Sequence, residues 1–299
     1  MSFVLALVKL PFVLLLEIIY FILRCRPKKD IRNQQILITG AGQGIGAEFA
    51  RQFAKMGNTV HCVDIEEELT DKIVAELKEN GHEAFPYTCD LTKHKQVQDL
   101  YDEISGTGFV INILANNAGV AFGRGLQDMT LTQIQHSLSV NIISNLWLIK
   151  LFLPKMLELD EGHIVNMASV LGFFPSRNST DYCAAKAGSI HTLNQLRLDH
   201  MESKVNFTAV CPFFVDTKMI VGVKASVAMS AKCLVTKAIR GIRENKEVII
   251  VPGWFNILKI VQDFTPPYFV RSLLWAATEY SKRNVTGNFV GQRMIEKIQ

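Results

Sequence analysis

Thr39-Gly40-Ala41-Gly42-Gln43-Gly44-Ile45-Gly46 is the stretch that decides the fold of this 299-residue chain. It follows the apolar run Ile36-Leu37-Ile38 and precedes apolar residues at helical spacing that continue to Ala54, which indicates strand, glycine-rich turn and helix. Such a turn lets the backbone approach a pyrophosphate, whose charge is stabilised by the amides and the dipole at the helix N-terminus. The predicted phosphate-binding positions are Gly40, Gly42, Gln43, Gly44, Ile45 and Gly46.

A second predicted strand, residues 59–64, ends in the carboxylate of Asp64. The number of residues between the glycine turn and Asp64 matches the spacing at which dinucleotide-binding folds place the acidic residue that binds the adenosine ribose. The carboxylate would accept hydrogen bonds from both ribose hydroxyls and repel a 2′-phosphate. Gln43, Ile65 and Glu66 supply no positive charge that would offset this repulsion. The sequence therefore predicts NAD rather than NADP as the cofactor.

The rest of the chain alternates apolar runs with segments of helical length. With 48% hydrophobic residues, the chain can bury one large α/β core, in which parallel strands appear as continuous apolar runs. We therefore predict a single doubly wound parallel sheet in one domain, residues 34–299. The further predicted strands are residues 84–89, 110–115, 163–167, 207–211 and 248–251.

Tyr182 and Lys186 stand one helical turn apart, thirteen residues after Ser169. The phenol and the ammonium therefore face the same side of a helix. A nearby positive charge favours the phenolate and would lower the pKa of Tyr182 from its usual value of about 10. The Ser169 hydroxyl could hold the oxygen that gains or loses a proton. The three side chains predict a proton-transfer centre.

Composition excludes several other classes of function. The net charge of +4 is small, and no basic and aromatic arrangement indicates binding to nucleic acid,. The six cysteines and seven histidines show no metal-ligand spacing,. We expect no bound metal, and we expect reduced thiols in a domain that faces the cytosol.

The N-terminal segment, residues 1–30, predicts a membrane anchor with a basic flank. Residues 3–23 are almost wholly apolar and are followed by Arg24, Arg26, Lys28 and Lys29, and about twenty apolar residues can span a bilayer. The segment has no small-x-small cleavage site, which argues against a cleaved signal peptide. The dinucleotide-binding unit is complete without it, which argues against a helix buried in the core. The basic flank places the catalytic domain in the cytosol. Lys9, Pro11 and Glu17 leave open whether the segment spans the bilayer or lies in one leaflet, as on a lipid droplet.

From about residue 35 to residue 288, the chain resembles the short-chain dehydrogenases/reductases. The resemblance rests on the glycine stretch, on Asn116-Asn117-Ala118-Gly119, and on Ser169, Tyr182 and Lys186. It implies a Rossmann-type fold, alcohol or carbonyl substrates, and a homodimer through the helices that start near Leu131 and Asp181. Asp90 looks like the family's carboxylate that contacts adenine.

The resemblance also implies a four-member catalytic set of Asn141, Ser169, Tyr182 and Lys186. In this family Tyr is the general acid or base, Ser positions the substrate oxygen, Lys binds the nicotinamide ribose and lowers the Tyr pKa, and Asn supports a proton-relay water. Further implied cofactor contacts are Leu91, Asn117, Ala118, Gly119, Tyr182, Lys186, Pro212, Val215 and Thr217.

One departure from the family pattern is Phe213, which replaces the usual glycine after Pro212 and puts an aromatic ring beside the substrate entrance. With the anchor, it resembles the membrane-bound branch of retinol dehydrogenases, retinaldehyde reductases and lipid-droplet 17-beta-hydroxysteroid dehydrogenases. Apolar residues in the expected lid, 215–229, and in the stretch 251–275 would accept a lipophilic alcohol from a membrane.

The predicted function is therefore NAD-dependent interconversion of a retinol-type or hydroxysteroid-type alcohol and its carbonyl. The predicted location is the endoplasmic reticulum membrane or a lipid droplet, with the catalytic domain facing the cytosol. Two alternatives stay open from the sequence. One is a catalytically weak scaffold protein at such a surface, and the other is an NADP-dependent retinaldehyde reductase.

Overall fold

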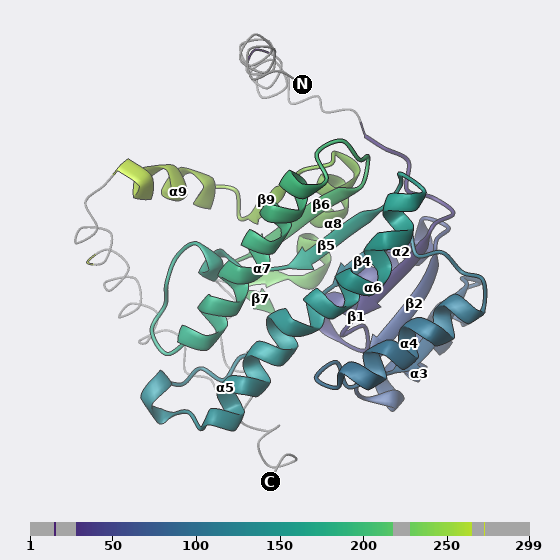
Figure 1. The fold of residues 1–299 in the computed structure, drawn as a ribbon, viewed down its shortest axis with the longest axis horizontal. Helices are drawn as coiled ribbons and strands as arrows, with labels where there is room; N and C mark the ends of the chain where they lie inside the picture. The colour runs from purple at the N-terminus through teal and green to yellow at the C-terminus, as the bar shows by residue number, and fades with distance from the viewer. Residues whose placement is uncertain (1–14, 16–27, 218–227, 265–271, 273–299) are drawn as a thin grey trace.

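A seven-stranded parallel sheet forms the centre of the protein (Figure 1). The computed structural model describes residues 15, 28–217, 228–264 and 272. Within these residues every pairing in the sheet is parallel, and central strands are buried on both faces, as continuous apolar runs require,. The strands are β1 (Gln35–Thr39), β2 (Thr59–Asp64), β3 (Ala84–Thr88), β4 (Ile113–Asn116), β5 (His163–Met167), β6 (Asn206–Pro212) and β9 (Val248–Val251).

The order of strands in the sheet is β3-β2-β1-β4-β5-β6-β9. The chain builds outward from β1 to β3, returns to the middle of the sheet at β4, and then builds outward in the other direction. Between β1 and β4 the helices that follow the two strands leave to opposite faces, which opens a crevice at the carboxyl ends of the strands. A separate pair of two-residue strands, β7 (Val215–Asp216) and β8 (Met229–Ser230), lies beside the end of β6.

Helices cover both faces of the sheet. One buried cluster joins β1 to α2, α3 and α8, and a second joins the opposite face of the sheet to α4, α6 and α7, which lie towards the viewer in Figure 1. The helices are α2 (Gly44–Lys55), α3 (Glu67–Glu79), α4 (His94–Gly106), α5 (Leu131–Leu138), α6 (Ser144–Glu158), α7 (Thr180–Asp199), α8 (Ala231–Arg243) and α9 (Phe255–Phe264), with the short turns η1 (Leu126–Asp128), η2 (Ser139–Ile143) and η3 (Val170–Gly172).

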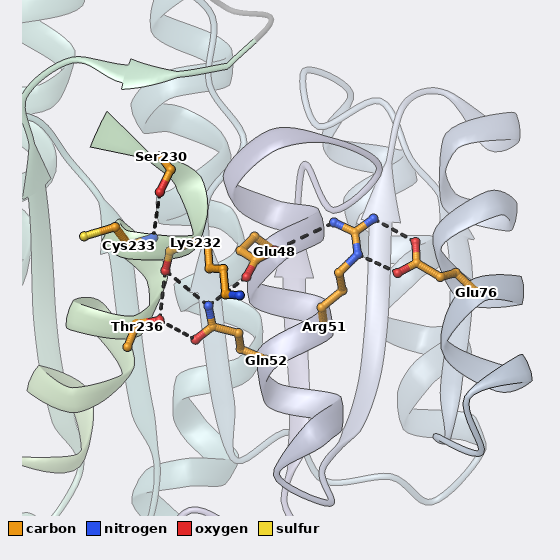
Figure 2. Close-up of polar contacts among 8 residues, drawn as sticks. All are labelled: Glu48, Arg51, Gln52, Glu76, Ser230, Lys232, Cys233 and Thr236. Atoms are coloured by element: carbon orange, nitrogen blue, oxygen red, sulfur yellow. Dashed lines mark hydrogen bonds and ion pairs between the residues drawn. The ribbon is translucent and has the colours of Figure 1, made fainter. Parts of the chain in front are cut away.

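Polar side chains hold α2 between its two neighbours on the first face (Figure 2). Arg51 donates two hydrogen bonds to the carboxylate of Glu76 on α3, at 2.6 and 2.7 Å. On the other side, Gln52 accepts a bond from Thr236 and donates one to the Lys232 carbonyl, both on α8. These contacts fix the position of α2, whose first turn carries the glycine stretch.

The predicted doubly wound sheet is confirmed, and each predicted strand is present within a few residues of its expected bounds. One boundary was wrong, because the strand predicted at 110–115 begins only at Ile113. The preceding residue, Asn112, donates its amide to the Gln35 carbonyl at 2.9 Å, and its side-chain oxygen accepts the Gln35 amide at 2.8 Å. Most of the predicted membrane anchor, residues 1–30, lies outside the described residues, as do residues 218–227 of the expected lid and residues 265–271 and 273–275 of the apolar stretch 251–275.

One described helix is long and apolar enough to cross a membrane by length and composition alone. This helix, Leu131–Glu158, comprises α5, η2 and α6. Leu148, Phe152 and Met156 of its second half are buried against the sheet in the second core cluster. It is therefore part of the domain core, as such helices commonly are.

Candidate active site

A cavity of about 250 Å³ lies at the carboxyl ends of the strands, beside the neighbouring strands β1 and β4. Its wall brings together residues from the glycine stretch, the ends of β2, β3, β4 and β5, the helices α5 and α7, the turn η2, and the segment after β6. The predicted site residues that line it are Gly40, Gln43, Gly44, Ile45, Asp64, Asp90, Leu91, Asn117, Ala118, Gly119, Ser169, Tyr182, Lys186, Pro212, Val215 and Thr217. Gly42, Gly46 and Asn141 stand behind the wall.

The glycine stretch presents the start of α2 to this cavity. Gly44 has a φ of +58°, a conformation that side chains rarely adopt,. The helix has no side-chain cap at Gln43 and no acidic residue in its first turn, so its first amides stay available to an anionic ligand. By contrast, Thr130 caps α5 and Ser230 caps α8 with their hydroxyl oxygens. The uncapped helix end fits a cofactor pyrophosphate.

Asn117, just after β4, ties the glycine stretch to the neighbouring strand. Its side-chain amide donates to the carbonyls of Thr39, at 2.9 Å, and Gly40, at 3.2 Å. In return the Thr39 hydroxyl accepts the amides of Asn117 and Ala118, each at 3.0 Å. The side-chain nitrogen of Asn117 is thus used within the protein, where it links the ends of β1 and β4.

Asp64 closes the next part of the wall. Its Oδ2 accepts the Gly42 amide at 3.0 Å, and its Oδ1 accepts the amides of Ile65 and Glu66 at 2.8 and 3.3 Å. Burial raises the pKa of Asp64, while these three hydrogen bonds act in the lowering direction. A carboxylate has about four acceptor sites, so Oδ2 keeps capacity for a ribose hydroxyl.

Asp90 follows β3 and lines the same cavity. Its Oδ1 accepts two bonds from Thr92, one from the amide at 2.9 Å and one from the hydroxyl at 2.7 Å. The amide of Asp90 donates to the side chain of Gln96 at 2.7 Å. These contacts orient the carboxyl group, and they leave Oδ2 without a hydrogen bond that the described residues provide.

Ser169, Tyr182 and Lys186 meet in the cavity from two different elements. Ser169 follows β5, and its Oγ accepts the Leu171 amide at 3.1 Å. Tyr182 and Lys186 lie on α7, with the Lys186 Nζ 5.4 Å from the centre of the Tyr182 ring. The ammonium donates to the Met167 carbonyl at 2.8 Å. The structure thus brings the three side chains together in one cavity, and their role in proton transfer stays a prediction.

The pKa of Tyr182 differs from the expected one. Burial raises the pKa of Tyr182 to about 12, whereas its hydrogen bond with Ser169 lowers it. Burial also lowers the pKa of Lys186 to about 8. Removing the phenolate from water therefore outweighs the hydrogen bond with Ser169, and the protein's own groups hold the pKa of Tyr182 above its usual value,.

Asn141 is placed one layer behind the cavity. It lies in the π-helical turn η2, between α5 and α6, and is fully buried. Its side chain accepts the Val120 amide at 3.2 Å and donates to the carbonyls of Val120 and Ser137 at 2.8 and 2.9 Å. Such a turn commonly occurs at functional sites. Here it brings Asn141 against the loop after β4, where the residue holds Val120 in the cavity wall.

An aromatic cluster borders the cavity beyond β6. The Phe213 ring, which lines the cavity, lies 4.5 Å from Phe214 and 4.9 Å from Phe255, centre to centre. Phe255 in turn lies 4.0 Å from Trp254 and 5.8 Å from Phe174. The substitution of phenylalanine for the family's glycine therefore joins the cavity wall to the start of α9 through apolar contacts.

Several wall residues carry no signal that singles them out in the sequence. Met167 and Ala168 directly precede Ser169, and Val140 directly precedes Asn141. Their closeness in sequence to predicted site residues could have indicated that they line the cavity. His136 stands one helical turn before Val140, and only the helix spacing connects it to the site. The wall residues that sequence reasoning did not assign to the cofactor site are Ile65, Cys89, Val120, Ala121, His136, Val140, Met167, Ala168 and Phe213. Within the described residues no group of three or more metal-ligating side chains occurs.

Comparison with known proteins gives a consistent set of relatives. A sequence model described as short chain dehydrogenase matches residues 34–227. Epidermal retinol dehydrogenase 2 of Mus musculus is 28% identical over 287 residues, covering 93% of this chain and 92% of that protein. Retinol dehydrogenase 10-B of Danio rerio is 33% identical, with 81% of each chain covered. The 17-beta-hydroxysteroid dehydrogenase 13 of Rattus norvegicus is 29% identical, with 82% and 84% covered.

Solved structures share the fold. A short-chain dehydrogenase from Sphingobium yanoikuyae in complex with NADPH is 27% identical, with a TM-score of 0.70, covering 77% of this chain and 94% of that one. A short chain dehydrogenase/reductase from Burkholderia phymatum in complex with NAD has a TM-score of 0.71 at 24% identity, covering 77% and 93%. Both carry the same doubly wound architecture.

Proposed function

The chain belongs to the short chain dehydrogenase family, in the branch of retinol and 17-beta-hydroxysteroid dehydrogenases, and we propose that it interconverts a lipophilic alcohol and its carbonyl with NAD. The supporting observation is one cavity lined both by Asp64, at the end of β2, and by Ser169, Tyr182 and Lys186. The dinucleotide and the reacting oxygen would thus share one space. The retinol and steroid names of the relatives support a lipophilic substrate.

In the proposed reaction, Ser169 and Tyr182 hold the substrate oxygen by hydrogen bonds. Tyr182 takes the hydroxyl proton in oxidation and returns it in reduction. The nicotinamide of NAD, when bound, supplies the hydride acceptor, and its positive charge would favour the phenolate that burial opposes. Lys186 would hold the nicotinamide ribose, and Asn141 acts as a positioning residue through Val120 and the π-helical turn.

The choice of NAD over NADP rests on Asp64. Replacing Asp64 with alanine is expected to lower the ratio of kcat/KM with NAD to kcat/KM with NADP roughly 10- to 100-fold, because ribose hydrogen bonds and the repulsion of a 2′-phosphate are both lost. Steady-state kinetics with both cofactors measures this ratio, which is insensitive to a general loss of activity.

The matched control is Glu66→Ala, which removes a carboxylate two residues away that is outside the cavity wall. It should leave the ratio unchanged within about threefold, a shift of less than 1 kcal/mol. A wild-type enzyme that already prefers NADPH would refute the proposed cofactor and favour a retinaldehyde reductase.

We also propose that the substrate reaches the cavity from a membrane or lipid-droplet surface along α9. Phe255 packs inward against Phe213, whereas Trp254, Ile257 and Ile260 are 53%, 64% and 58% exposed. An amphipathic helix with an exposed apolar face suits the boundary between lipid headgroups and acyl chains. Lys259, which lies over the Phe173 ring at 4.5 Å, suits the same boundary,.

Charged substitutions on α9 test this route. The double variant Ile257→Glu and Ile260→Glu should raise the apparent KM for retinol in phospholipid vesicles at least fivefold, since two charges oppose insertion of the apolar face. The KM for the same alcohol in detergent micelles should stay within about twofold. The matched control, Leu198→Glu and Met201→Glu, changes two exposed apolar residues at the end of α7, 63% and 74% exposed. An unchanged vesicle KM in the α9 variant would contradict the proposed route.

A substrate panel tests the proposed function itself. Membranes that carry the protein are incubated with NAD and with retinol, hydroxysteroids or long-chain alcohols, and NADH absorbance is followed. We expect turnover with at least one of these alcohols and none in membranes that carry Tyr182→Phe. Binding of NADH without turnover of any alcohol would favour the scaffold alternative.

A further inference from the structure

A hollow of about 420 Å³ lies where the described chain enters the domain, just before β1. It shares no wall residue with the cavity of the candidate active site. Four of its wall residues are basic and one is acidic. The wall consists of Lys28, Asp30, Arg32, Lys55, Met56 and Arg243. The hollow is therefore a separate and strongly basic feature of the surface.

The acidic residue of this wall is already paired. Asp30 accepts hydrogen bonds from the Arg32 guanidinium, the shortest of which is 2.6 Å. These bonds hold the pKa of Asp30 down at about 2, so the carboxylate is ionised at neutral pH. Four positive charges less one negative charge leave an excess of three, because the described residues add no other carboxylate to the wall. Such an excess favours an anionic ligand.

Contacts with the domain hold the entering segment in place. The Lys29 amide donates to the Arg243 carbonyl at 2.7 Å, and the Lys29 Nζ hydrogen-bonds Nδ1 of the buried His163 at 2.9 Å. Ile31 is fully buried in the first core cluster. The residues on either side of Lys29 and Ile31 belong to the wall of the hollow. The folded domain therefore sets the shape of the hollow.

The other basic wall residues come from two helix ends. Lys55 is in the last turn of α2, and Arg243 is in the last turn of α8. Cations are favourable at this end of a helix, which accounts for these two side chains. It does not account for Lys28, an exposed residue that precedes the first strand. The helix dipoles therefore do not explain why three separate parts of the chain place basic residues around one hollow.

The predicted membrane anchor ends close to this hollow in the chain. Its apolar run ends at Leu23, and Lys28 follows five residues later. Five residues of chain span at most about 18 Å. A membrane that holds the anchor therefore keeps the hollow near its headgroups, where anionic lipids attract basic clusters.

We propose that the hollow binds the phosphate of an anionic lipid headgroup at the surface of the membrane that holds the anchor. Lys28 and Lys55 contact the phosphate as compact charges. Arg243, whose Nε bonds the Lys29 carbonyl at 3.4 Å, offers its terminal nitrogens,. Such contacts fix how the domain is oriented on the membrane. The site is independent of the proposed dehydrogenase activity, so either proposal can fail without the other.

Neutralising two wall lysines tests this site. Dihexanoyl phosphatidic acid, a soluble anionic lipid, is titrated by calorimetry into the full chain in a nonionic detergent. The double variant Lys28→Gln and Lys55→Gln should raise the dissociation constant at least about fivefold, because two charge-assisted hydrogen bonds are lost. The matched control, Lys150→Gln and Lys232→Gln, changes exposed lysines of α6 and α8 outside the wall. It should keep the constant within about twofold of wild type.

Two further ligands identify the source of the phosphate. Inorganic phosphate lacks the glycerol and acyl groups that the Met56 side chain can contact, and it should bind at least about fivefold more weakly than phosphatidic acid. Dihexanoyl phosphatidylcholine carries a choline cation that the basic wall repels, and it should also bind at least about fivefold more weakly.

Lysine acetylation locates the contact on a membrane. The full chain is reconstituted in phosphatidylcholine vesicles with and without phosphatidylserine, and a water-soluble ester acetylates its exposed lysines. Phosphatidylserine should slow the acetylation of Lys28 and Lys55 at least about threefold, since bound phosphate covers their ammonium groups. Mass spectrometry of the same samples should show unchanged rates at Lys150 and Lys232.

Three results would overturn the proposal. The first is an equal dissociation constant for phosphatidic acid in wild type and in the variant of Lys28 and Lys55. The second is inorganic phosphate that binds as tightly as phosphatidic acid, which would mean a site for small anions. The third is acetylation that phosphatidylserine leaves unchanged at both lysines. If the double variant does not fold, Lys28→Gln alone replaces it, with an expected loss of at least about threefold.

Discussion

Replacing Tyr182 with phenylalanine should lower kcat at least about 10³-fold and leave the dissociation constant for NADH unchanged within about twofold. The phenol is the proposed proton donor and acceptor, and positioned acid or base groups contribute about 10² to 10⁴ in rate. Phenylalanine keeps the ring beside the Lys186 ammonium, 5.4 Å from the ring centre. The substitution therefore removes one hydroxyl group and preserves the packing of α7.

Turnover of the best alcohol from the panel and calorimetry with NADH measure these two effects. Because burial holds the pKa of Tyr182 high, at about 12, the phenolate fraction increases with pH. We therefore expect wild-type alcohol oxidation to accelerate as pH rises from 7 to 9, and the variant to lose that dependence. Cys183→Ala, a change at the neighbouring residue on α7, is the control and should keep kcat within about threefold. Retention of more than a tenth of the wild-type kcat in Tyr182→Phe would exclude Tyr182 as the acid or base.

Replacing Gly46 with alanine should abolish NADH binding at concentrations tenfold above the wild-type dissociation constant. A Cβ at this position would lie 2.0 Å from the Gly40 carbonyl oxygen and 2.7 Å from the Asn117 side-chain nitrogen. Neither atom can move aside easily, because one belongs to the backbone and the Asn117 amide is hydrogen-bonded to the carbonyls of Thr39 and Gly40. The backbone of the glycine stretch must move, and the start of α2 moves with it.

The same substitution should lower the free energy of unfolding by about 2–3 kcal/mol, which is typical of an overpacked site. Chemical denaturation and NADH calorimetry measure the two effects. Gly106→Ala is the matched control, because a Cβ there meets no atom within 4 Å and the residue has no positive φ. It should bind NADH as the wild type does. Wild-type affinity in Gly46→Ala would mean that the close approach of α2 to β1 is not needed for binding.

Residues that act through local geometry could be predicted from the sequence. The glycine stretch, the acidic end at Asp64 and the apolar strands located the sheet and many residues of the cavity wall. These features depend on neighbours in the chain, such as a glycine at a turn or an apolar run of strand length. The start of β4 was misplaced by three residues, because the apolar run from Val110 shows hydrophobicity but not which of its residues pair with the neighbouring strands.

Residues whose role depends on packing could not be predicted in the same way. Asn141 matches the family's catalytic asparagine by motif, yet its side chain is bonded to Val120 and Ser137 behind the cavity wall. Helix spacing predicted that Lys186 lies beside Tyr182, but the sequence could not show how far burial raises the pKa of the Tyr182 phenol. The basic hollow before β1 carries no motif, because packing brings its wall together from the entering segment, α2 and α8.

The amino-acid sequence by itself determined the doubly wound fold, the glycine stretch at the start of α2, the pairing of Tyr182 with Lys186 and membership of the dehydrogenase family. Backbone conformation and helix or strand periodicity are local properties, and they can be read along the chain. Only the tertiary structure decided which side chains face the cavity, which stand behind it, and how far burial shifts their pKa values. Those properties depend on distances and on solvent exclusion between residues from different elements, which linear order does not specify.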